Sequence, residues 1–594
     1  MSSSLRKTTA ALIKRTTYSA TSTLLPGSGS ARSGPPDGQG VAAEIEKSIA
    51  SGALKQLKQQ QQRQQQQQQV AEPAAKVGVT TATATTTTTA TTAATTKAQT
   101  AVRPYSEVPG PYPLPLIGNS WRFAPLIGMY KISELDKIMH ELHVNYGKMA
   151  KVGGLIGHPD LLFVFDGDEI RNIFKKEEAM PHRPSMPSLR HYKGELRRDF
   201  FGDVAGLIGV HGPKWEAFRQ EVQQILLQPQ TAKKYIKPLN DIASEFMLRI
   251  EEMRNEQQQL PDNFLHELYK WALESVGRVS LDTRLGCLKP EGSAEAQQII
   301  EAINTFFWAV PELELRMPLW RLYPTKAYRS FVRALDQFSA ICMKHIGQTM
   351  DKAAARKAQP EHEADISIVE RIVRKTGNRK LAAVLALDLF LVGVDTTSVA
   401  ASSTIYQLAK NPEKQQRLFD ELKRVFPTQD AQINQHVLEQ MPYMRACVKE
   451  TLRMKPVVIA NGRNLQADAV INGYHVPKGT HVIFPHLVVS NDPTYFPEPK
   501  RFMPERWLKQ APAAVTESCP HAAQKIHPFV SLPFGYGRRM CVGRRFAEIE
   551  LHTLLAKIFR KYEVSYESDE FVYRVNSTYI PQSPLNFKLT PRPA

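Results

Sequence analysis

One cysteine of this chain lies in a glycine-rich, strongly cationic stretch, FGYGRRMCVGRR, at positions 534–545. Its first two glycines, Gly535 and Gly537, favour a tight loop with unusual backbone dihedral angles. A helical pattern of apolar residues follows over 542–559. Cys541 is therefore expected at a helix N-terminus among four arginines, and both features favour the thiolate form of its side chain.

A cysteine thiolate is a metal ligand, and the surrounding sequence limits which metal it can bind. No second cysteine or histidine lies at zinc spacing from Cys541, which argues against a tetrahedral zinc site. Haem iron needs only one thiolate from the protein, because the porphyrin supplies four in-plane nitrogens and its propionates bind cations. A haem-binding loop fits the stretch, and a structural cysteine after a glycine loop is the simpler alternative.

The stretch resembles the haem loop of the cytochrome P450 monooxygenases, whose pattern is F-x-x-G-x-R-x-C-x-G. The residues that match every defined position are Phe534, Gly537, Arg539, Cys541 and Gly543. The resemblance extends over about 103–591 and implies the cytochrome P450 fold, which is mainly α with a minor β region and has a long, central, buried helix. It also implies haem b as the cofactor, with Cys541 as the axial ligand of the iron.

Further patterns of the family occur in the expected order. ETLR supplies Glu450 and Arg453 one helical turn apart, and FMPERW supplies Arg506. In the family these three side chains form a buried ionic triad. An isolated E-x-x-R usually marks a solvated helix face, but this one lies between a long apolar segment and the cysteine loop, which favours the triad.

Four side chains are assigned to the haem propionates by the same resemblance. WEAFR supplies Trp215 and Arg219 one helical turn apart, and the family pattern adds Arg463 and Arg539. Each arginine considered alone fits an ordinary surface position.

An acid and a hydroxyl, Asp395 and Thr396, lie in a long apolar segment, 380–411, that is predicted to form a buried helix. Burying such groups costs free energy. The resemblance implies that the pair delivers protons to dioxygen at the iron, and a simple helix kink is the alternative. Val392 stands where the family usually has Ala or Gly, so its extra methyl groups are expected to reshape the pocket.

The remaining pattern predicts a mostly helical protein with a small sheet. Helices are expected at 214–227 and 326–350, and β-structure with two turns at 469–485. The resemblance implies that the walls of the substrate pocket come from the region after Pro184 and from 387–394, 457–460 and 579–584.

The first hundred residues differ from the rest. A run of glutamine, 58–69, and a run of Thr and Ala, 80–96, cannot bury enough apolar surface to fold. We predict disordered low-complexity sequence over 37–100 and one cytochrome P450 domain over 101–594. Residues 1–36 have five basic residues, no acidic residue and many Ser and Thr, which is typical of a mitochondrial presequence; a basic unstructured tail has the same composition.

Composition excludes several other classes. The chain shows no secretory signal, and no segment is expected to span a membrane. The formal net charge of +18 suits an acidic partner or anionic lipid, but basic residues are not interleaved with aromatic ones, so nucleic acid is not expected. The five cysteines are scattered and odd in number, which argues against a disulfide framework.

Basic residues near the cysteine loop indicate a redox partner. Arg544 and Arg545 resemble the double arginine of mitochondrial members, and Arg445 and Lys449 share one helix face. An acidic, adrenodoxin-like ferredoxin, reduced by its NADPH-dependent reductase, is expected to dock there; an ordinary solvated face is the alternative.

The mitochondrial class implies a place on the matrix side of the inner membrane. The segment 306–324 mixes large apolar and basic residues and resembles the connection between two lid helices, so it is expected to make monotopic membrane contact or to line the substrate entrance. ANGRN and RPYSEVPGP resemble the arthropod branch, which includes ecdysteroid hydroxylases and enzymes linked to insecticide breakdown.

The sequence thus predicts a monooxygenase that inserts one atom of O2 into a hydrophobic substrate. A haem-thiolate isomerase or dehydratase without a reductant is a second hypothesis, although such relatives often lack the acid and alcohol pair. A non-enzymatic haem or lipid carrier is a third.

Overall fold

Helices make up most of the described part of the chain, which comprises residues 101–124, 128–183, 186–204, 206–356, 366–508 and 526–593 of this computed structural model. These residues belong to one compact unit, Ala98–Ala594. The predictions for residues 1–36 and 37–100, and the cysteine at position 519, lie outside the described residues.

The elements confirm the predicted mainly α fold with a minor β region. The helices are α3 (Leu135–Tyr146), α4 (Gly167–Lys175), α5 (Pro187–His191), α6 (Arg198–Phe201), α7 (Gly212–Leu226), α8 (Pro229–Lys233), α9 (Ile236–Met253), α10 (Phe264–Leu281), α11 (Ala294–Glu314), α12 (Lys326–Arg356), α13 (Ile368–Thr376), α14 (Arg379–Ala409), α15 (Pro412–Val425), α16 (Gln435–Glu439), α17 (Pro442–Met454), α18 (His486–Val489) and α20 (Arg544–Lys561).

The strands are short and form four small sheets. They are β1 (Met149–Val152), β2 (Leu161–Val164), β3 (Asn461–Asn464), β4 (Ala469–Ile471), β5 (Tyr474–Val476), β6 (His481–Phe484), β7 (Tyr562–Ser565), β8 (Tyr573–Val575), β9 (Tyr579–Pro581) and β10 (Lys588–Pro591). The largest sheet has the order β1-β2-β6-β3, with only the β2–β6 pair parallel. The others pair β10 with β7, β4 with β5 and β8 with β9.

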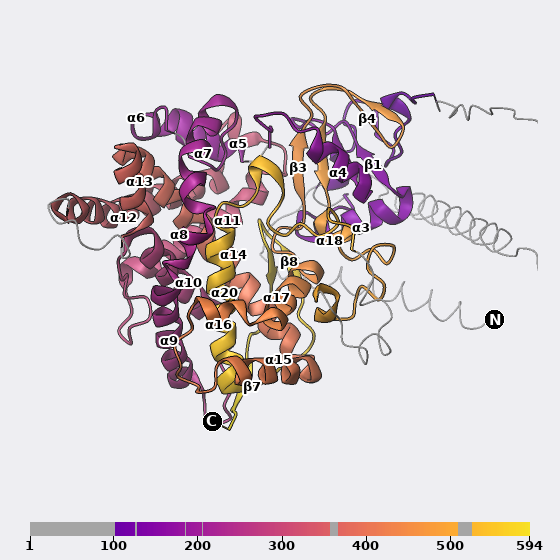
Figure 1. Cartoon of the computed structure of the whole chain (residues 1–594). Helices are drawn as coiled ribbons and strands as arrows, with labels where there is room; N and C mark the ends of the chain where they lie inside the picture. The colour runs from indigo at the N-terminus through magenta and orange to yellow at the C-terminus, as the bar shows by residue number, and fades with distance from the viewer. Residues whose placement is uncertain are drawn as a thin grey trace, which may run out of the picture. The chain divides into compact units, whose positions relative to one another are not determined.

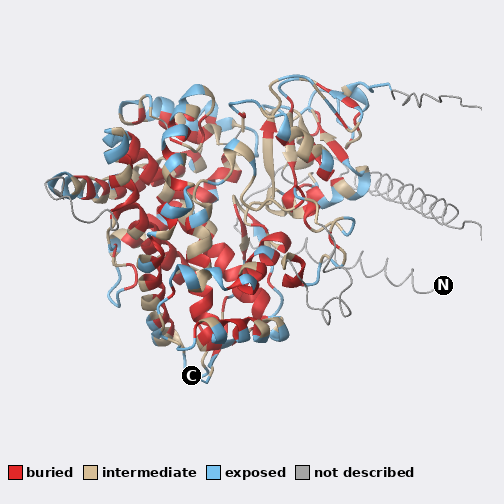
Figure 2. Cartoon of the chain, in the orientation of Figure 1, coloured by how far each residue is buried: buried red, intermediate tan, exposed pale blue. Residues whose placement is uncertain are grey.

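The described residues form two apolar cores, one mainly helical and one around the largest sheet. The larger core lies among the helices, and the second gathers residues of β1, β2 and β6 with those of α3, α4 and α18. In Figure 1 the sheet and these three helices lie together at the upper right of the helical part. Buried residues, in red, are concentrated inside the helical part in Figure 2.

Helix α14 runs through the helical part and agrees with the helix predicted at 380–411. It begins where the Asn378 side chain accepts a hydrogen bond from the backbone N–H of Leu381 at 2.9 Å. Its length and composition alone would suffice to cross a membrane. However, 78% of its most apolar stretch is buried inside the protein, as in the core helix of a large domain.

Helix α11 extends further than the sequence indicates. We expected 306–324 to be a connection, but the helix continues through Pro311 to Glu314 before a short 3₁₀ turn at Leu319–Arg321. Proline lacks an N–H, so the carbonyl of Phe307 has no helical donor four residues on. The Ser577 hydroxyl donates to that carbonyl instead, at 2.9 Å. This bond compensates for the proline and ties the β8–β9 turn to α11.

Glu450 lies at the centre of a buried polar network beside α17. Its carboxylate accepts two hydrogen bonds from Arg453, both at 2.9 Å, and one from Arg506 at 3.3 Å. The backbone N–H of Met503 and the indole N–H of Trp507 also donate to it. The three charged side chains are almost fully buried, so each depends on the others for compensation of its charge.

Replacing Glu450 with Ala should reduce the free energy of unfolding by about 3–5 kcal/mol, because two guanidinium groups would stay buried with their shared carboxylate removed. Denaturant unfolding of the haem-loaded protein measures this change. Glu567→Ala is a matched control, because Glu567 pairs with Lys588 at the surface, where a lost pair costs less than about 1 kcal/mol. Equal losses in the two variants would contradict this prediction.

Glu314, at the end of α11, carries a perturbed carboxyl group. It accepts hydrogen bonds from the backbone N–H and the hydroxyl of Ser188. Burial raises its pKa to about 7, and the bonds from Ser188 only partly oppose this shift. The pKa is thus higher in the folded than in the unfolded protein, so ionisation of Glu314 destabilises the fold as pH rises from about 4.5 through 7.

Glu314→Gln should therefore leave stability near pH 5 almost unchanged and increase it relative to the unsubstituted protein at pH 8, by on the order of 2 kcal/mol. The amide keeps an oxygen that can accept the bonds from Ser188. Unfolding midpoints measured at both pH values test this. The prediction fails if the variant and the unsubstituted protein show the same pH dependence.

Candidate functional site

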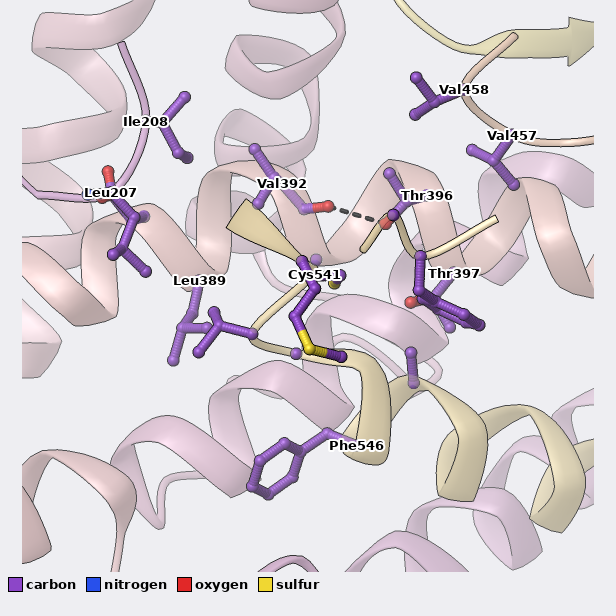
Figure 3. Close-up of a pocket in the computed structure, with 18 of the residues that line it drawn as sticks. Leu207, Ile208, Leu389, Val392, Thr396, Thr397, Val457, Val458, Cys541 and Phe546 are labelled. Carbon is purple, nitrogen blue, oxygen red and sulfur yellow. Dashed lines mark hydrogen bonds between the residues drawn. The ribbon is translucent and has the colours of Figure 1, made fainter. Parts of the chain in front are cut away.

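A cavity of about 420 Å³ lies between α14 and the loop that carries Cys541. Its walls come from segments far apart in the sequence: α7, α10, α14, the loop at 206–208, the segment after α17 and the start of α20. Figure 3 shows Thr396 and Val392 of α14 on one side and Cys541 with Phe546 on the other.

Cys541 reaches this cavity from the tip of its loop. The loop is closed by a hydrogen bond from the backbone N–H of Cys541 to the carbonyl of Phe534, at 2.9 Å. Gly537 adopts a φ of 72°, which an L side chain rarely adopts, and a Cβ there would lie 2.9 Å from a carboxylate oxygen of Glu177. The thiol is exposed only toward the cavity, because protein surrounds it elsewhere.

The electrostatics of Cys541 differ from the expectation that its neighbouring arginines favour a thiolate. Burial raises the pKa of the Cys541 thiol, while the backbone at Gly543 and two more distant cations, Arg219 and Arg183, oppose this effect. Arg538 of the loop forms an ion pair with Glu216 rather than with the thiol. Burial therefore outweighs the cations, and the protein alone does not hold the free thiol in its ionised form.

Trp215 and Arg219 of α7 point into the cavity region as the W-x-x-x-R spacing predicts. The Arg219 guanidinium donates to the carbonyl of Met540 at 3.1 Å and to the Gln223 side chain at 3.2 Å. The guanidinium carbon of Arg539 lies 3.4 Å from the centre of the Trp215 ring, a close cation–π contact. Sequence-distant parts of the predicted cofactor site thus contact one another.

Arg463 lies on β3 and is buried. It forms an ion pair with Glu177. Burial raises the pKa of Glu177, although the positive charges of Arg463 and Arg539 oppose this shift. One carboxylate therefore faces two of these arginines.

Two side chains of the same cavity wall were missed by sequence reasoning. Arg183 lines the cavity beside Arg463 and Arg539, and burial together with Arg463 lowers its pKa to about 10. His486, directly after β6, also lines it, and burial with the two nearby arginines lowers its pKa to about 4. Neither residue belongs to a periodic or spaced motif, so only the fold reveals them.

Several buried polar atoms at this site have no hydrogen-bond partner among the residues that the structure describes. They are Nη2 of Arg463, Nη2 of Arg539, Nδ1 of His182, Nδ1 of His211 and Nε2 of His486. The two arginine atoms are donors, and buried donors without partners cost free energy. A ligand with carboxylates fits these arginines, because it would supply both the missing acceptors and the missing negative charge.

Comparison with known proteins identifies the family. The family model described as Cytochrome P450 matches residues 108–590. The chain belongs to the cytochrome P450 family. Such enzymes are haem-containing monooxygenases, so the chain is an oxidoreductase with a haem cofactor, as the sequence predicted.

Relatives of this cytochrome P450 include arthropod proteins. It is 79% identical over 595 residues to "Probable cytochrome P450 49a1" of Drosophila melanogaster, covering 99% of this chain and 100% of the relative. "Probable cytochrome P450 301a1, mitochondrial" of the same organism is 44% identical, covering 82% and 87%. "Cytochrome P450 CYP12A2" of Musca domestica is 33% identical, covering 82% and 91%. These matches confirm the predicted resemblance to the arthropod mitochondrial branch.

A solved structure agrees on the fold. The crystal structure of cytochrome P450DA heme domain superposes with a TM-score of 0.65 at 17% sequence identity, covering 83% of this chain and 99% of that one.

The acid and alcohol of this cytochrome P450 face different surroundings. The Thr396 hydroxyl lines the cavity and donates to the carbonyl of Val392 at 2.8 Å (Figure 3). Asp395 accepts hydrogen bonds from Tyr269 at 3.0 Å and Thr578 at 2.7 Å, and burial raises its pKa. No cation is among these partners, so Asp395 is held by neutral hydroxyls.

The pocket walls agree with most of the predicted regions. The lining includes Leu207 and Ile208, seven residues of α14 of which four lie within 387–394, and Val457 with Val458. The predicted range 579–584 does not line the cavity; the preceding turn, with Ser577 and Thr578, does so instead. Strand β9 is turned away because the Tyr579 ring stacks on Tyr573 and its hydroxyl donates to Asp136.

Val392 and Gly393 occupy the cavity side of α14. A Cβ added to Gly393 would lie 3.0 Å from a methyl carbon of Val276, so this glycine permits close packing of α10 and α14. Val392 contributes its methyl groups to the wall one helical turn before Thr396.

The basic residues expected at a partner surface are engaged to different degrees. Arg445 of α17 is half-buried and donates to two carbonyls at the end of α16. Lys449 is exposed. Arg544 forms an ion pair with Glu548 at 2.9 Å, and Arg545 is exposed but donates through Nε to the Leu227 carbonyl.

Proposed function

We propose that this cytochrome P450 is a mitochondrial haem-thiolate monooxygenase. Cys541 would be the axial ligand of the iron, and electrons would come from NADPH through a ferredoxin reductase and a ferredoxin. The observation that carries the proposal is a single cavity with Cys541 on one wall and buried arginines with unpaired donors around it. The family match supplies the reaction class.

Haem b fits this cavity by the chemistry of the residues that surround it. Arg183, Arg219 and Arg539, which line the cavity, would hold its two propionates, with Trp215 packed on Arg539. Arg463 is not among the lining residues, but it lies close to Arg183 and Arg539 and would add positive charge there. The nearby Phe534, Gly537 and Gly543 shape the loop that presents Cys541. When bound, the haem supplies electron acceptance and dioxygen activation, which no side chain here can supply.

Thr396 is the proposed proton donor within the cavity. Its hydroxyl proton is held by the Val392 carbonyl at 2.8 Å, and release of that bond frees it toward the cavity. Asp395 would return a proton to this position. Burial raises the pKa of Asp395, which favours proton uptake by its carboxylate, and the bonds from Tyr269 and Thr578, which oppose this shift, fix its position.

The substrate is proposed to be a small hydrophobic molecule, either a steroid hormone of the ecdysteroid kind or a xenobiotic such as an insecticide. The support is the composition of the wall, to which Leu207, Ile208, Val392, Val457 and Val458 contribute apolar side chains. Burial of apolar substrate surface would supply most of the binding free energy.

A ferredoxin is proposed to dock near α17 and α20. Lys449 and Arg545 are exposed there, whereas Arg445 is half-buried against two carbonyls and the charge of Arg544 is neutralised by Glu548. The proposed docking therefore depends chiefly on Lys449 and Arg545. An acidic partner would be guided to them by charge.

The proposed location is the matrix side of the inner mitochondrial membrane. Relatives named as mitochondrial and the basic composition of residues 1–36 support it. Monotopic contact is proposed at the α11–α12 connection, where apolar side chains are exposed: Leu315, Met317, Leu319, Leu322 and Tyr323.

Cys541→His should abolish thiolate ligation while leaving a side chain that can still bind iron. The red-shifted Soret band of the reduced carbon monoxide complex should be replaced by a band typical of histidine-ligated haem. Met540→Leu is a matched control in the same loop, because its backbone contacts remain. Retention of the red-shifted band in Cys541→His would refute the ligand assignment.

Thr396→Ala should lower product formed per NADPH consumed roughly tenfold or more, because proton delivery in the cavity is lost. The released fraction of hydrogen peroxide should rise in the reconstituted system with a mitochondrial ferredoxin and its reductase. Thr404→Ala is the control, because Thr404 lies on α14 and bonds Ala400 but is not among the cavity lining. Turnover by the unsubstituted protein without ferredoxin and NADPH would instead favour an isomerase or dehydratase.

A further inference from the structure

A buried ion pair fixes the loop at 206–208 to the central helix. Nζ of Lys193 lies 2.8 Å from Oδ1 of Asp388, and both side chains are 5% exposed. Asp388 belongs to α14 and lines the cavity, whereas Lys193 lies in a single π-helical turn, Tyr192–Leu196. Such turns are rare and often occur at functional sites.

The same carboxylate also holds the backbone of the loop. Oδ2 of Asp388 accepts a hydrogen bond from the backbone N–H of Leu207 at 2.6 Å. Lys193 donates in addition to the carbonyl of Ile208 at 3.4 Å. Asp388 and Lys193 therefore bond the N–H of one loop residue and the carbonyl of the next, so the pair sets where both side chains point.

The loop packs directly against the ion pair. Gly206 has a φ of 85°, and a Cβ there would lie 2.3 Å from Oδ2 of Asp388. The ammonium group of Lys193 also lies over the Phe201 ring, 5.4 Å from its centre. The loop thus rests directly on α14, and a side chain at 206 would separate the two.

The two residues held in this way are cavity residues. Leu207 and Ile208 lie on the same side of the cavity as Leu389 and Val392 in Figure 3. Their positions limit the space in front of Cys541. Lys193 neutralises the charge of Asp388, whose carboxylate lines the wall. A substrate therefore needs no positive charge to balance this carboxylate.

We propose that the Lys193–Asp388 pair determines substrate specificity by holding Leu207 and Ile208 in the cavity wall. The proposal rests on the proposed function, since it takes this cavity to hold haem and substrate. Lys193 and Asp388 are positioning residues: they act on the substrate through the loop. Removing either charge should loosen the loop and weaken the binding of ligands large enough to reach it.

Azole ligands that bind haem iron test this directly. Imidazole is too small to reach the loop, whereas clotrimazole carries three aromatic rings that contact the cavity walls. In Asp388→Asn and Lys193→Met, the Kd for clotrimazole from Soret titration should rise roughly tenfold, the scale set by a few lost apolar contacts. The Kd for imidazole should stay within about twofold.

Two further variants separate this role from general damage. Lys193→Arg keeps the positive charge and should retain clotrimazole affinity within about threefold. Asp351→Asn breaks an exposed pair with Arg379 at the start of α14, 3.0 Å long, and should change neither Kd. If Asp388→Asn does not load haem, the double variant Lys193→Met/Asp388→Leu repeats the test with an apolar pair.

Unchanged clotrimazole affinity in the haem-loaded variants would overturn the proposal, as would an equal loss in Asp351→Asn. Failure of the proposed function would give a different result. If the unsubstituted protein showed no Soret shift with imidazole, the haem site itself, and with it the proposed function, would be wrong.

Discussion

The site depends on positive charge buried beside a cavity. Arg183, Arg219, Arg463 and Arg539 come from four separate segments, and the one carboxylate described beside them, that of Glu177, faces only Arg463 and Arg539. Mutual repulsion and burial lower the pKa of Arg539 to about 9, which expresses how unfavourable this arrangement is without compensation. Burying charges is tolerated only when they are paired. Under the proposed function the two propionates of haem would provide that pairing, which would couple cofactor binding to folding.

Carboxylates of three helices hold the part of the chain between Ser188 and Ile208, which contributes Leu207 and Ile208 to the cavity wall. Glu314 of α11 bonds Ser188, Asp336 of α12 bonds Tyr192 and Arg197, and Asp388 of α14 bonds Lys193 and the loop. Each of the three helices thus holds this part of the chain through one carboxylate. Under the proposed function the arginines would face the cofactor, while these carboxylates hold the chain that limits the substrate space.

Much of this could be predicted from the sequence, because the cysteine loop, the W-x-x-x-R pair and the E-x-x-R pair have fixed spacing. The core helix was also predictable, since α14 is apolar on nearly every face. Arg183 and His486 were not, because they contribute to the site only through tertiary contacts. The continuation of α11 through Pro311 could not be predicted either, since it depends on a hydroxyl from residue 577. The hydrogen-bond partners of Asp395 could not be predicted for the same reason: they come from α10 and the β8–β9 turn, which are far from Asp395 in the sequence.

The central claim is that the propionates of haem compensate the buried arginines. Competition between haem and haem dimethyl ester, whose carboxylates are neutral, tests it directly in the apoprotein. The ester keeps the iron and the ring, so only the charge differs. The account predicts that haem binds roughly a hundredfold more tightly or better, the scale of truncating one partner of a buried charge pair. Equal affinity for the two compounds would contradict it.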